Sequence, residues 1–395
     1  MGSLDGIRVL DLSRFQACPL SSMILGDMGA EVIRIESPEG APDRTWGQLG
    51  PDGETLLYKI VNRNKKGITL NLDIPEGREI FHGLVKNSDV VLHNFTPGAP
   101  VSSEISYERL KEVNPSIIVA ALTGYGQSGP EAENPCFDGV AQARSGSMVM
   151  NGFPGDPPLK TGIPYIDVMG GLWTAIGVIM AIYHREKTNV GQAIDVSLFD
   201  VAFFATQSVG TLLLYAISGE IRRQIGNLGF HSYNGCFKTK DQWVQITTAT
   251  NSIWRRFVKA IGKEDLIHHP KMKNDMDRFY HASLIDPIVN KWMEQRTADE
   301  VVSILKKARI PCSILKTVDQ LLSDPQVEAR EMIKLMNYPE MGEIPVPGVP
   351  VKLSVTPGSI NIPSPKLGEH NKEVYCGLLG FSSQKISRLK REGVI

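Results

Sequence analysis

The stretch of sequence that decides the fold is residues 7–35, IRVLDLSRFQACPLSSMILGDMGAEVIRI. It holds two runs rich in β-branched residues, Ile7–Leu12 and Glu31–Ile35, and both runs predict strands. The apolar run between them, Leu20–Met28, predicts a helix that ends at Gly29. A helix that joins two strands in this way brings them into one sheet as parallel strands. Residues 7–35 therefore indicate an α/β fold.

The same alternation of strand and helix continues to about residue 200. We expect further strands and helices at Ile68–Leu72, Asp89–His93, Ser116–Leu122 and Ala193–Leu198 (strands), and at Pro75–Lys86, Tyr107–Val113 and from Asp167 onward (helices). Repeated alternation is typical of a parallel sheet with helices on both faces. Ligands of such sheets bind in the loops that follow the carboxyl ends of the strands.

The pattern changes near Arg222, where a second region begins. The run Gly235–Thr247 alternates in a way typical of an antiparallel strand. Three helical runs follow it, at Ile253–Ile261, Ser283–Met293 and Ala298–Ala308. Proline becomes frequent after Asp324, and a last helix is expected at Ser383–Arg391. We therefore predict a large domain, a smaller α/β domain, and a linker that returns to the large domain, at residues 1–221, 222–325 and 326–395.

The composition argues against several classes of function. Lys and Arg number 42 against 43 Asp and Glu, and a net charge of −1 gives no field that favours nucleic acid or an anionic membrane. The five cysteines form no CxxC pair and the eight histidines show no metal-ligand spacing, so we expect neither disulfides nor a metal. Residues 1–6 lack the features of a secretory signal, and we expect a cytoplasmic protein. The apolar runs Met169–Tyr183 and Leu198–Ile217 are expected to be buried helices rather than membrane spans.

Asp167 lies between Pro164 and an apolar helical run. Aspartate is a favoured N-cap residue, so one interpretation is a helix cap. Gly170 and Gly171 then fall in the first turn, where glycine lowers helix stability. Glycine at such positions indicates the close approach of another backbone or of a ligand. A structural and a functional role for Asp167 both stay open on this ground.

Ten segments, in order along the chain, carry a resemblance to a known family. They are Leu4–Ser13, Phe15–Pro19, Gly29–Glu36, Asn64–Leu72, Asn94–Ala99, Thr123–Pro130, Phe137–Asp138, Asp167–Gly171, Pro347–Ser354 and Leu367–Asn371. By their number, order and spacing the chain resembles the family III CoA-transferases, the group of the formyl-CoA, carnitine and bile-acid CoA-transferases. The resemblance implies a large Rossmann-like parallel-sheet domain, a smaller α/β domain, and an interlocked homodimer.

The resemblance also implies a catalytic mechanism. Asp167 matches the family's catalytic aspartate, which attacks an acyl-CoA thioester and then carries CoA as an aspartyl thioester to an acceptor carboxylic acid. Gln16 matches the glutamine beside that aspartate, and Asp138 matches an acidic position facing the same site. Taken alone, Asp138 is also a candidate cap for a helix at residues 139–146, and the two roles are compatible.

Further residues match positions that bind CoA, which enters as a substrate rather than as a permanently bound cofactor. They are Arg14, Phe15, Ala17, Leu70, Asn94 and Phe95. Positions that often hold a basic residue for the phosphates in relatives are here Ser37, Asp73 and Ser102, and cations that could replace them are Arg34, Lys65 and Lys66. Gly226 and Gly229 occupy the region of the family's active-site glycine loop.

Three alternatives are weighed against this interpretation. An α-methylacyl-CoA racemase needs a histidine base where this chain has Phe137, and phenylalanine cannot transfer a proton. A dinucleotide-dependent oxidoreductase needs a GxGxxG motif after the first strand, and residues 14–19 read RFQACP instead. A non-catalytic subunit of a heteromeric transferase would lack the nucleophile. The acid substrate stays open, since Arg144 is either a partner for a second carboxylate or a surface charge.

Overall fold

The computed structural model describes residues 2–395, which form two compact units. The first unit consists of residues up to 147, residues 160–219 and residues 325–395. The second unit consists of residues 148–159 and 220–324. The second unit thus includes a short segment, 148–159, that lies within the range predicted for the large domain.

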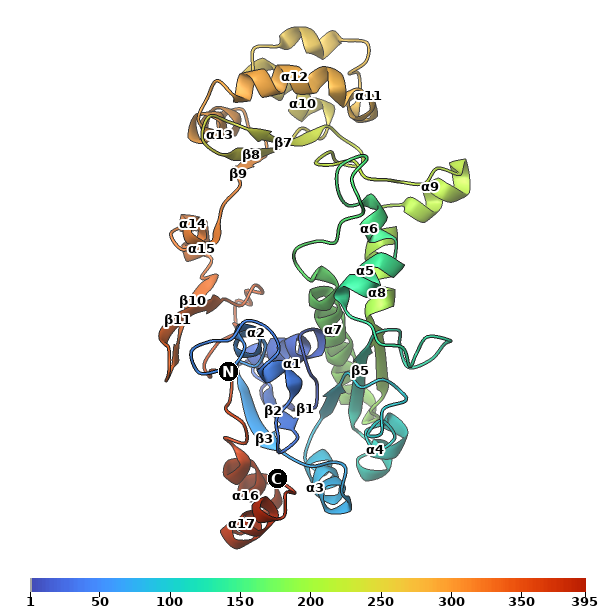
Figure 1. The fold of residues 1–395 in the computed structure, drawn as a ribbon, viewed down its shortest axis with the longest axis vertical. Coiled ribbons are helices and arrows are strands. Elements are labelled where there is room, and N and C mark those ends of the chain that lie inside the picture. The colour runs from blue at the N-terminus through green and yellow to red at the C-terminus, as the bar shows by residue number, and fades with distance from the viewer. Residues whose placement is uncertain (1) are drawn as a thin grey trace. The chain divides into compact units, whose positions relative to one another are not determined.

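A six-stranded parallel sheet forms the centre of the first unit (Figure 1). Its strands are β1 (Arg8–Asp11), β2 (Glu31–Glu36), β3 (Lys65–Thr69), β4 (Val90–His93), β5 (Ile118–Thr123) and β6 (Ala193–Ser197). They lie in the order β3-β2-β1-β4-β5-β6, and Leu10 of β1 pairs with Ile33 on one side and Val91 on the other. The strand order reverses between β1 and β4, which is where open α/β sheets bind their ligands. The predicted parallel α/β fold is confirmed.

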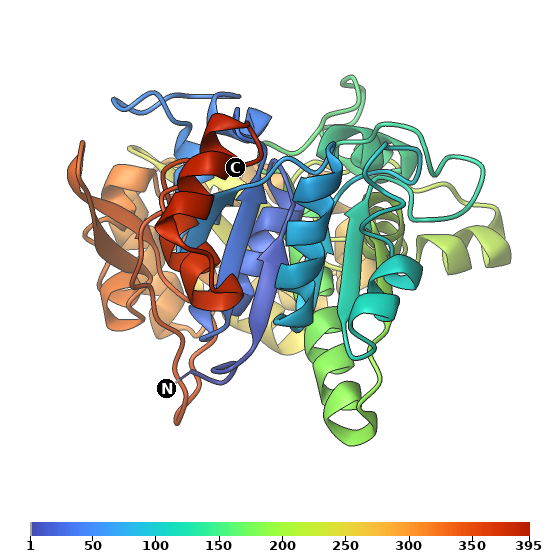
Figure 2. The same ribbon diagram turned by 90° about the horizontal axis from the view of Figure 1, so that it is seen from below.

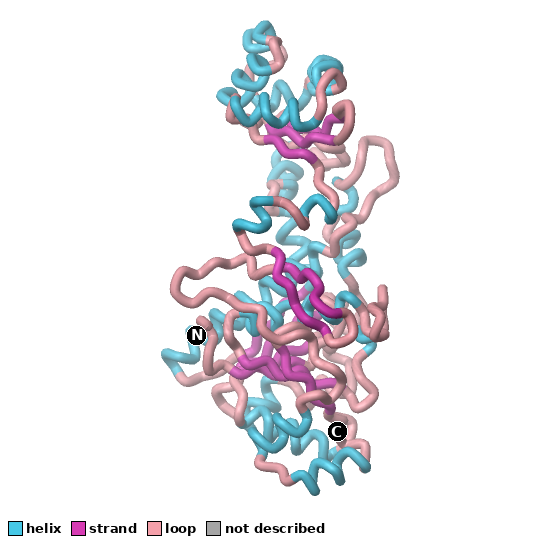
Figure 3. Tube along the Cα trace, turned by 90° about the vertical axis from the view of Figure 1, so that its left-hand side faces the viewer, coloured by secondary structure: helices cyan, strands magenta, loops and turns pink. Residues whose placement is uncertain are grey.

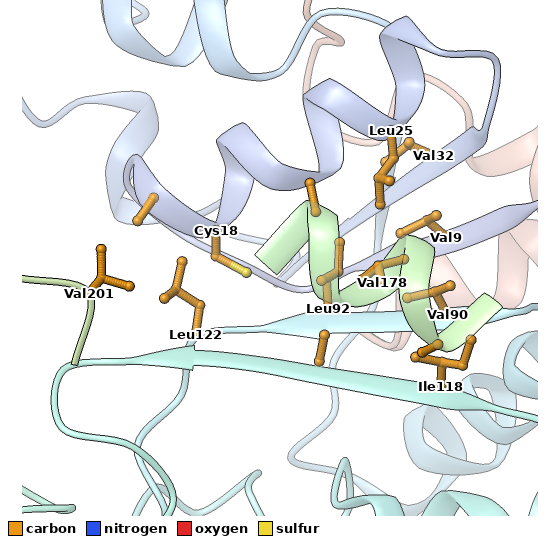
Figure 4. Close-up of a cluster of buried hydrophobic side chains, with 14 of the residues drawn as sticks. Val9, Cys18, Leu25, Val32, Val90, Leu92, Ile118, Leu122, Val178 and Val201 are labelled. Carbon is orange, nitrogen blue, oxygen red and sulfur yellow. The ribbon is translucent and has the colours of Figure 1, made fainter. Parts of the chain in front are cut away.

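Helices cover both faces of this sheet (Figure 2). One face packs against α1 (Ala17–Asp27), α5 (Asp138–Arg144), α7 (Tyr165–Thr188) and α8 (Leu198–Gln207). The other face packs against α3 (Pro75–Lys86), α4 (Tyr107–Val113), α16 (Asn371–Leu379) and α17 (Ser383–Arg391). Successive strand residues point to opposite faces, so Val9 joins the core under α1 and α7 whereas Leu10 joins the core under α3. Figure 4 shows the first of these cores, where Cys18 and Leu25 of α1 and Val178 of α7 pack on the strands.

Helix α7 lies so close to α1 that one of its residues must be glycine. A Cβ atom at Gly171 would lie 2.7 Å from the carbonyl oxygen of Ala17, closer than real Cβ contacts allow. The backbone that the glycine pair predicted to approach closely is therefore that of α1. This contact joins the start of α1 to the second turn of α7, close to the edge of the sheet where the strands end.

The structure differs from the prediction in the bounds of β3 and in the Pro-rich region after Asp324. Strand β3 begins three residues earlier than predicted, because Lys65 is buried and its ammonium group pairs with Asp11 at 2.8 Å. A buried lysine cannot be predicted from a pattern of apolar residues. The Pro-rich region contains an antiparallel hairpin, β10 (Ile333–Tyr338) and β11 (Gly342–Pro347), where only a linker was predicted. Proline fits β11 because each strand of a two-stranded hairpin has a free edge.

The second unit is a small α/β unit of its own (Figure 3). Its antiparallel sheet has the order β7 (Asn234–Lys238), β8 (Trp243–Thr247) and β9 (Cys312–Ile314). The single strand predicted over 235–247 is thus a hairpin, which turns where Thr239 N–H bonds to Gln242 O at 2.9 Å. The helices of this unit are α10 (Asn251–Ala260), α11 (Asp275–Tyr280), α12 (Ala282–Met293), α13 (Ala298–Lys307) and α14 (Val318–Leu321). The remaining short helices of the chain are α2 (Leu56–Val61), α6 (Ser147–Met150), α9 (Thr211–Ser218) and α15 (Pro325–Ala329).

The two apolar runs form helices that are only partly buried. By length and composition α7 is apolar enough to cross a membrane, and the bent pair α8–α9 passes the same test together. In this structure one side of α7 packs on α1, β5 and β6. Its other side exposes large apolar residues, and α9 has no buried residue at all. The expectation of buried helices therefore holds for one side of α7, and it is wrong for the other side of α7 and for α9.

Candidate active site

A cavity of about 290 Å³ lies at the carboxyl ends of β1, β4 and β5, beside the first turns of α1 and α7. Its lining includes Asp167 and Gln16, which were predicted to be catalytic. It also includes most of the residues predicted to bind CoA, namely Arg14, Phe15, Ala17, Asn94 and Phe95. The fold thus gathers residues that are far apart in the sequence around one carboxylate.

Asp167 lies within the first turn of α7 rather than at its cap. The helix begins at Tyr165 after Pro164, so the prediction that Asp167 begins the helix is wrong by two residues. The cap comes from another helix, because the carboxylate of Asp138 accepts the backbone N–H of Ile166 at 2.9 Å and that of Asp167 at 3.4 Å. The Asp167 carboxylate is therefore free of any capping role.

Asp138 is the first residue of α5, and its own helix gains no side-chain cap from it. The suggestion that it caps residues 139–146 is wrong, since its buried carboxylate faces α7 instead. Gln142 holds that carboxylate with its amide nitrogen at 2.5 Å, and its amide oxygen accepts Thr161 N–H at 3.1 Å. Asp138 is thus fixed in place beside Asp167 by a buried chain of hydrogen bonds.

The electrostatic environment of Asp167 is unusual. Burial, and to a smaller extent the charge of Asp138, raise the pKa of the Asp167 carboxyl from 3.8 to about 7. The positive end of the α7 dipole acts in the opposite direction, but desolvation outweighs it here. Near neutral pH the Asp167 carboxyl therefore titrates, and its ionised form is more basic than an ordinary carboxylate.

Gln16 and Phe15 connect β1 to α1 in a constrained conformation. Phe15 has a φ of 68°, which is rare for a bulky residue and raises the energy of the backbone. Gln16 precedes α1, and its side chain makes no capping hydrogen bond. Its amide is thus available to a ligand in the cavity that both residues line.

Trp46 and Cys136 lie close to the site but were not predicted from the sequence. Phe15 and Phe137 meet edge to face with ring centroids 5.4 Å apart, and Trp46 packs on both rings at 5.7 Å and 6.4 Å. Cys136 also lines the cavity, and burial raises the pKa of its thiol. Trp46 lies in a loop, so no periodic pattern of the sequence could have indicated its place. Cys136 could have been predicted, because it directly precedes Phe137 and Asp138 in the sequence.

A second cavity of about 280 Å³ adjoins the first and shares Arg14, Phe95 and Ala99 with it. It lies at the ends of β1, β2 and β3 and includes Leu70, the remaining residue predicted to bind CoA. Asn94 at the end of β4 clamps the backbone of Arg14, accepting its N–H at 3.0 Å and donating to its carbonyl at 2.8 Å. The guanidinium of Arg14 then lies 4.8 Å from the ring centre of Phe95.

The three cations proposed to replace the missing basic positions are already engaged. Arg34 and Lys65 are fully buried, where they pair with Asp43 and Asp11. Lys66 pairs with Glu31 and Glu373 at 2.7 Å each. Arg34 and Lys65 are therefore not accessible to a phosphate, and Lys66 is already paired with two carboxylates.

Other predicted residues lie outside these cavities. Gly226 and Gly229 belong to the second unit, where Gly226 has a φ of 63° beside the ring of Phe153, and their predicted place in an active-site loop stays a prediction. Arg144 pairs with Glu131 at 3.0 Å and does not line the Asp167 cavity. Across residues 2–395 no group of three or more His, Cys, Asp or Glu side chains is placed to hold a metal ion.

Comparison with known proteins decides the family. Residues 4–371 match the model of "CoA-transferase family III". The chain belongs to the family III CoA-transferases. It is 33% identical to succinyl-CoA–D-citramalate CoA-transferase of Chloroflexus aurantiacus, over 99% of this chain and 98% of that protein. It is also 31% identical to human succinyl-CoA:glutarate CoA-transferase, over 99% of this chain and 90% of that one.

Solved structures agree with the family III assignment. The crystal structure of a CAIB/BAIF family protein from Brucella suis matches with a TM-score of 0.83 at 29% identity, covering 95% of this chain and 99% of that one. A family III CoA-transferase acts on CoA thioesters, so the predicted activity and fold class are both confirmed. The interpretation as a dinucleotide-dependent oxidoreductase is wrong.

Proposed function

We propose that Asp167 is the nucleophile through which this family III CoA-transferase moves CoA from an acyl-CoA donor to a carboxylic acid. The observation that carries the proposal is the placement of Asp167, which is the one carboxylate among the described residues that line its cavity. It stands at the point of strand-order reversal, where the fold binds ligands.

The chemistry proceeds in balanced steps. The Asp167 carboxylate attacks the thioester carbonyl, the C–S bond breaks, and a mixed anhydride and CoA thiolate result. The thiolate attacks the Asp167 carbonyl of the anhydride, which releases the donor acid and leaves an aspartyl-CoA thioester. An acceptor carboxylate then reverses both steps. Each exchange is split into steps with good leaving groups.

The surroundings of Asp167 suit this role. A raised pKa makes its carboxylate a stronger nucleophile, and partial burial strengthens each polar contact within the site. The uncommitted Gln16 amide can donate to an acyl oxygen on which negative charge develops. Asp138 acts by fixing the first turn of α7, and therefore as a positioning residue.

The two adjoining cavities together suit a long substrate. We assign the thioester to the Asp167 cavity and the nucleotide to the second one, with the pantetheine arm passing Arg14 and Phe95 between them. The relatives named above act on succinyl-CoA, and succinyl-CoA is therefore the first donor to test.

We also propose a cytoplasmic homodimer, interlocked as the family resemblance implies. Support comes from an apolar stripe on the exposed side of α7, made by Leu172, Ile176, Met180 and Tyr183 at helical spacing. Leu213 and Ile217 of α9 are exposed too, at 69% and 85%. Exposed apolar surface of this extent is typical of a protein interface. The five cysteines are all unpaired, in keeping with a reducing compartment.

Trapping with hydroxylamine tests the nucleophile. The enzyme is incubated with succinyl-CoA and the other acyl-CoAs of a panel, hydroxylamine is added, and peptides are analysed by mass spectrometry. We expect a hydroxamate at Asp167 only with donors that also support CoA exchange. The matched control is Asp200→Asn at the start of α8, which should label normally. A competent donor that leaves Asp167 unlabelled, together with transfer by Asp167→Ala, would overturn the proposal.

A further inference from the structure

The charged residues that line the two cavities indicate which part of CoA this enzyme recognises. It rests on the proposed function, in which the thioester lies at Asp167 and the nucleotide lies in the second cavity. CoA carries a 5′-diphosphate and a separate 3′-phosphate, so three phosphate groups need partners or solvent. Proteins that recognise phosphate groups do so with charge-assisted hydrogen bonds, above all from arginine.

Arg14 is the one cation among the described residues that line either cavity. The second cavity presents two carboxylates as well, those of Glu36 and Asp73. Glu36 is neutralised, because it pairs with Arg44 at 2.7 Å and with Arg34 at 3.2 Å. Asp73 belongs to no ion pair of the described structure, and its charge acts on the Arg14 guanidinium that lines the same cavity.

The ion pairs of the first unit near Glu36, which lines the second cavity, supply no surplus positive charge. In them four cations meet five carboxylates: Arg34, Arg44, Lys59 and Lys65 against Asp11, Glu36, Asp43, Asp52 and Glu54. Beside it, Arg78 is also engaged, since it donates to the carbonyls of Leu72 and Asp73 and pairs with Glu104. A third phosphate in this cavity would therefore meet a neutral to negative surface.

Arg14 differs from these cations because its guanidinium has no hydrogen-bond partner among the described residues. Its backbone is held by Asn94, and its side chain lies over Phe95, so the group is positioned but uncommitted. It lines both cavities, which places it where the pantetheine arm meets the diphosphate. One phosphate contact can thus be made without breaking an ion pair.

We propose that this enzyme anchors CoA thioesters through a single phosphate contact, at Arg14, and does not recognise the 3′-phosphate. Thioesters of 3′-dephospho-CoA are then substrates equal to those of CoA. Arg14 contacts the diphosphate, which CoA and 3′-dephospho-CoA share. Asp73 is an anion and offers the 3′-phosphate no favourable contact.

Binding of CoA and of 3′-dephospho-CoA to the full-length enzyme, measured by isothermal titration calorimetry, tests this directly. We expect Kd values within about threefold of each other, because the same single contact serves both. The kcat/KM values for succinyl-CoA and succinyl-3′-dephospho-CoA should agree to the same extent. Binding of dephospho-CoA that is tenfold or more weaker than that of CoA overturns the inference.

Three variants make the test more specific. Asp73→Lys places a cation in the second cavity and should create a preference of fivefold or more for CoA over dephospho-CoA. Asp156→Lys changes the net charge equally in another part of the chain and should create none. Arg14→Met should weaken both ligands by the same factor, tenfold or more, and a larger loss for CoA than for dephospho-CoA contradicts the proposal.

The outcomes separate this inference from the proposed function. If CoA binds and dephospho-CoA does not, the inference fails and the proposed function stands. If neither ligand binds the wild-type enzyme, both fail. Asp73→Lys without a gained preference for CoA also counts against the inference, because it shows that the cavity does not receive the 3′ end of the nucleotide.

Discussion

The carboxylate of Asp138 accepts the backbone N–H of Asp167 at 3.4 Å, so one acidic residue caps the helix turn that carries another. The negative charge of the cap adds to burial in raising the pKa of the Asp167 carboxyl to about 7. The Asp138 carboxylate thus both fixes the first turn of α7 and contributes to the raised pKa of Asp167.

The first prediction concerns the pH dependence of activity. The attacking species is the ionised carboxylate, so log kcat/KM should rise with a slope of one below about pH 7 and level off above it. Asp138→Asn removes the neighbouring charge, and the acid limb should then move to lower pH. A pH profile whose limb stays in place in this variant would contradict the role of Asp138.

Asp138→Asn should also reduce stability. An asparagine can still accept Ile166 N–H through its oxygen, but its amide nitrogen then faces the amide nitrogen of Gln142. Two buried donors that face each other cost about 1–3 kcal/mol. Denaturant unfolding of Asp138→Asn beside the double variant Asp138→Asn/Gln142→Glu measures this, and the second change should restore part of the loss.

Asp167→Asn should be more stable than the wild type while it loses activity. The folded-state pKa lies above that of the unfolded chain, so the ionised carboxylate lowers stability as the pH rises from about 4 to about 7. Removing the charge should gain about 1–2 kcal/mol at pH 8 after solvent screening. Activity should fall more than about a thousandfold. Thermal unfolding at pH 8 and at pH 4.5 checks this, since the gain should vanish at the lower pH.

Gly171→Ala should destabilise the enzyme and impair catalysis. Its Cβ would meet the backbone oxygen of Ala17 at 2.7 Å, so α1 and α7 must separate, which costs about 1–3 kcal/mol. The matched control is Gly377→Ala in α16, where a Cβ meets nothing within 4 Å and stability should rise slightly. Equal effects of both substitutions on urea midpoints would show that the α1–α7 contact is not critical.

Met180→Glu should dissociate the proposed homodimer. Met180 lies on the exposed apolar stripe of α7 with 64% of its surface accessible, and burying a glutamate among the apolar side chains of the proposed interface would cost its hydration. Light scattering coupled to gel filtration should show a halved mass at micromolar concentration. Leu335→Glu on β10, which is equally exposed at 65%, should leave the mass unchanged.

Much of the fold could be predicted from the sequence. The bounds of α3, α4 and α17 match the predicted ranges, because those helices have clear periodic patterns and signals at their ends. The shift of β3 and the hairpin β10–β11 could not be predicted, since one depends on a buried lysine and the other on a pairing between proline-containing strands. Local patterns do not record such tertiary partners.

The sequence predicted which residues form the candidate site, but not how those residues contact one another. The resemblance pointed to Asp167, Gln16 and Asp138, and the fold brings all three together. The direction in which Asp138 caps was not predictable, because it depends on how α5 packs beside α7. The role of Trp46 and the engagement of Arg34, Lys65 and Lys66 also depend on contacts across more than one element.

The return of residues 371–395 to the first unit affects how this protein is made in the cell. Val374, Tyr375 and Leu389 close one face of the central sheet, and the Tyr375 hydroxyl donates to Thr69 O at 2.7 Å. On the ribosome, α3 and α4 emerge before β6, but the part of this face that α16 and α17 cover stays exposed until some 175 residues after β6 have been synthesised. We expect nascent chains that still lack α16 and α17 to expose this apolar patch to chaperones.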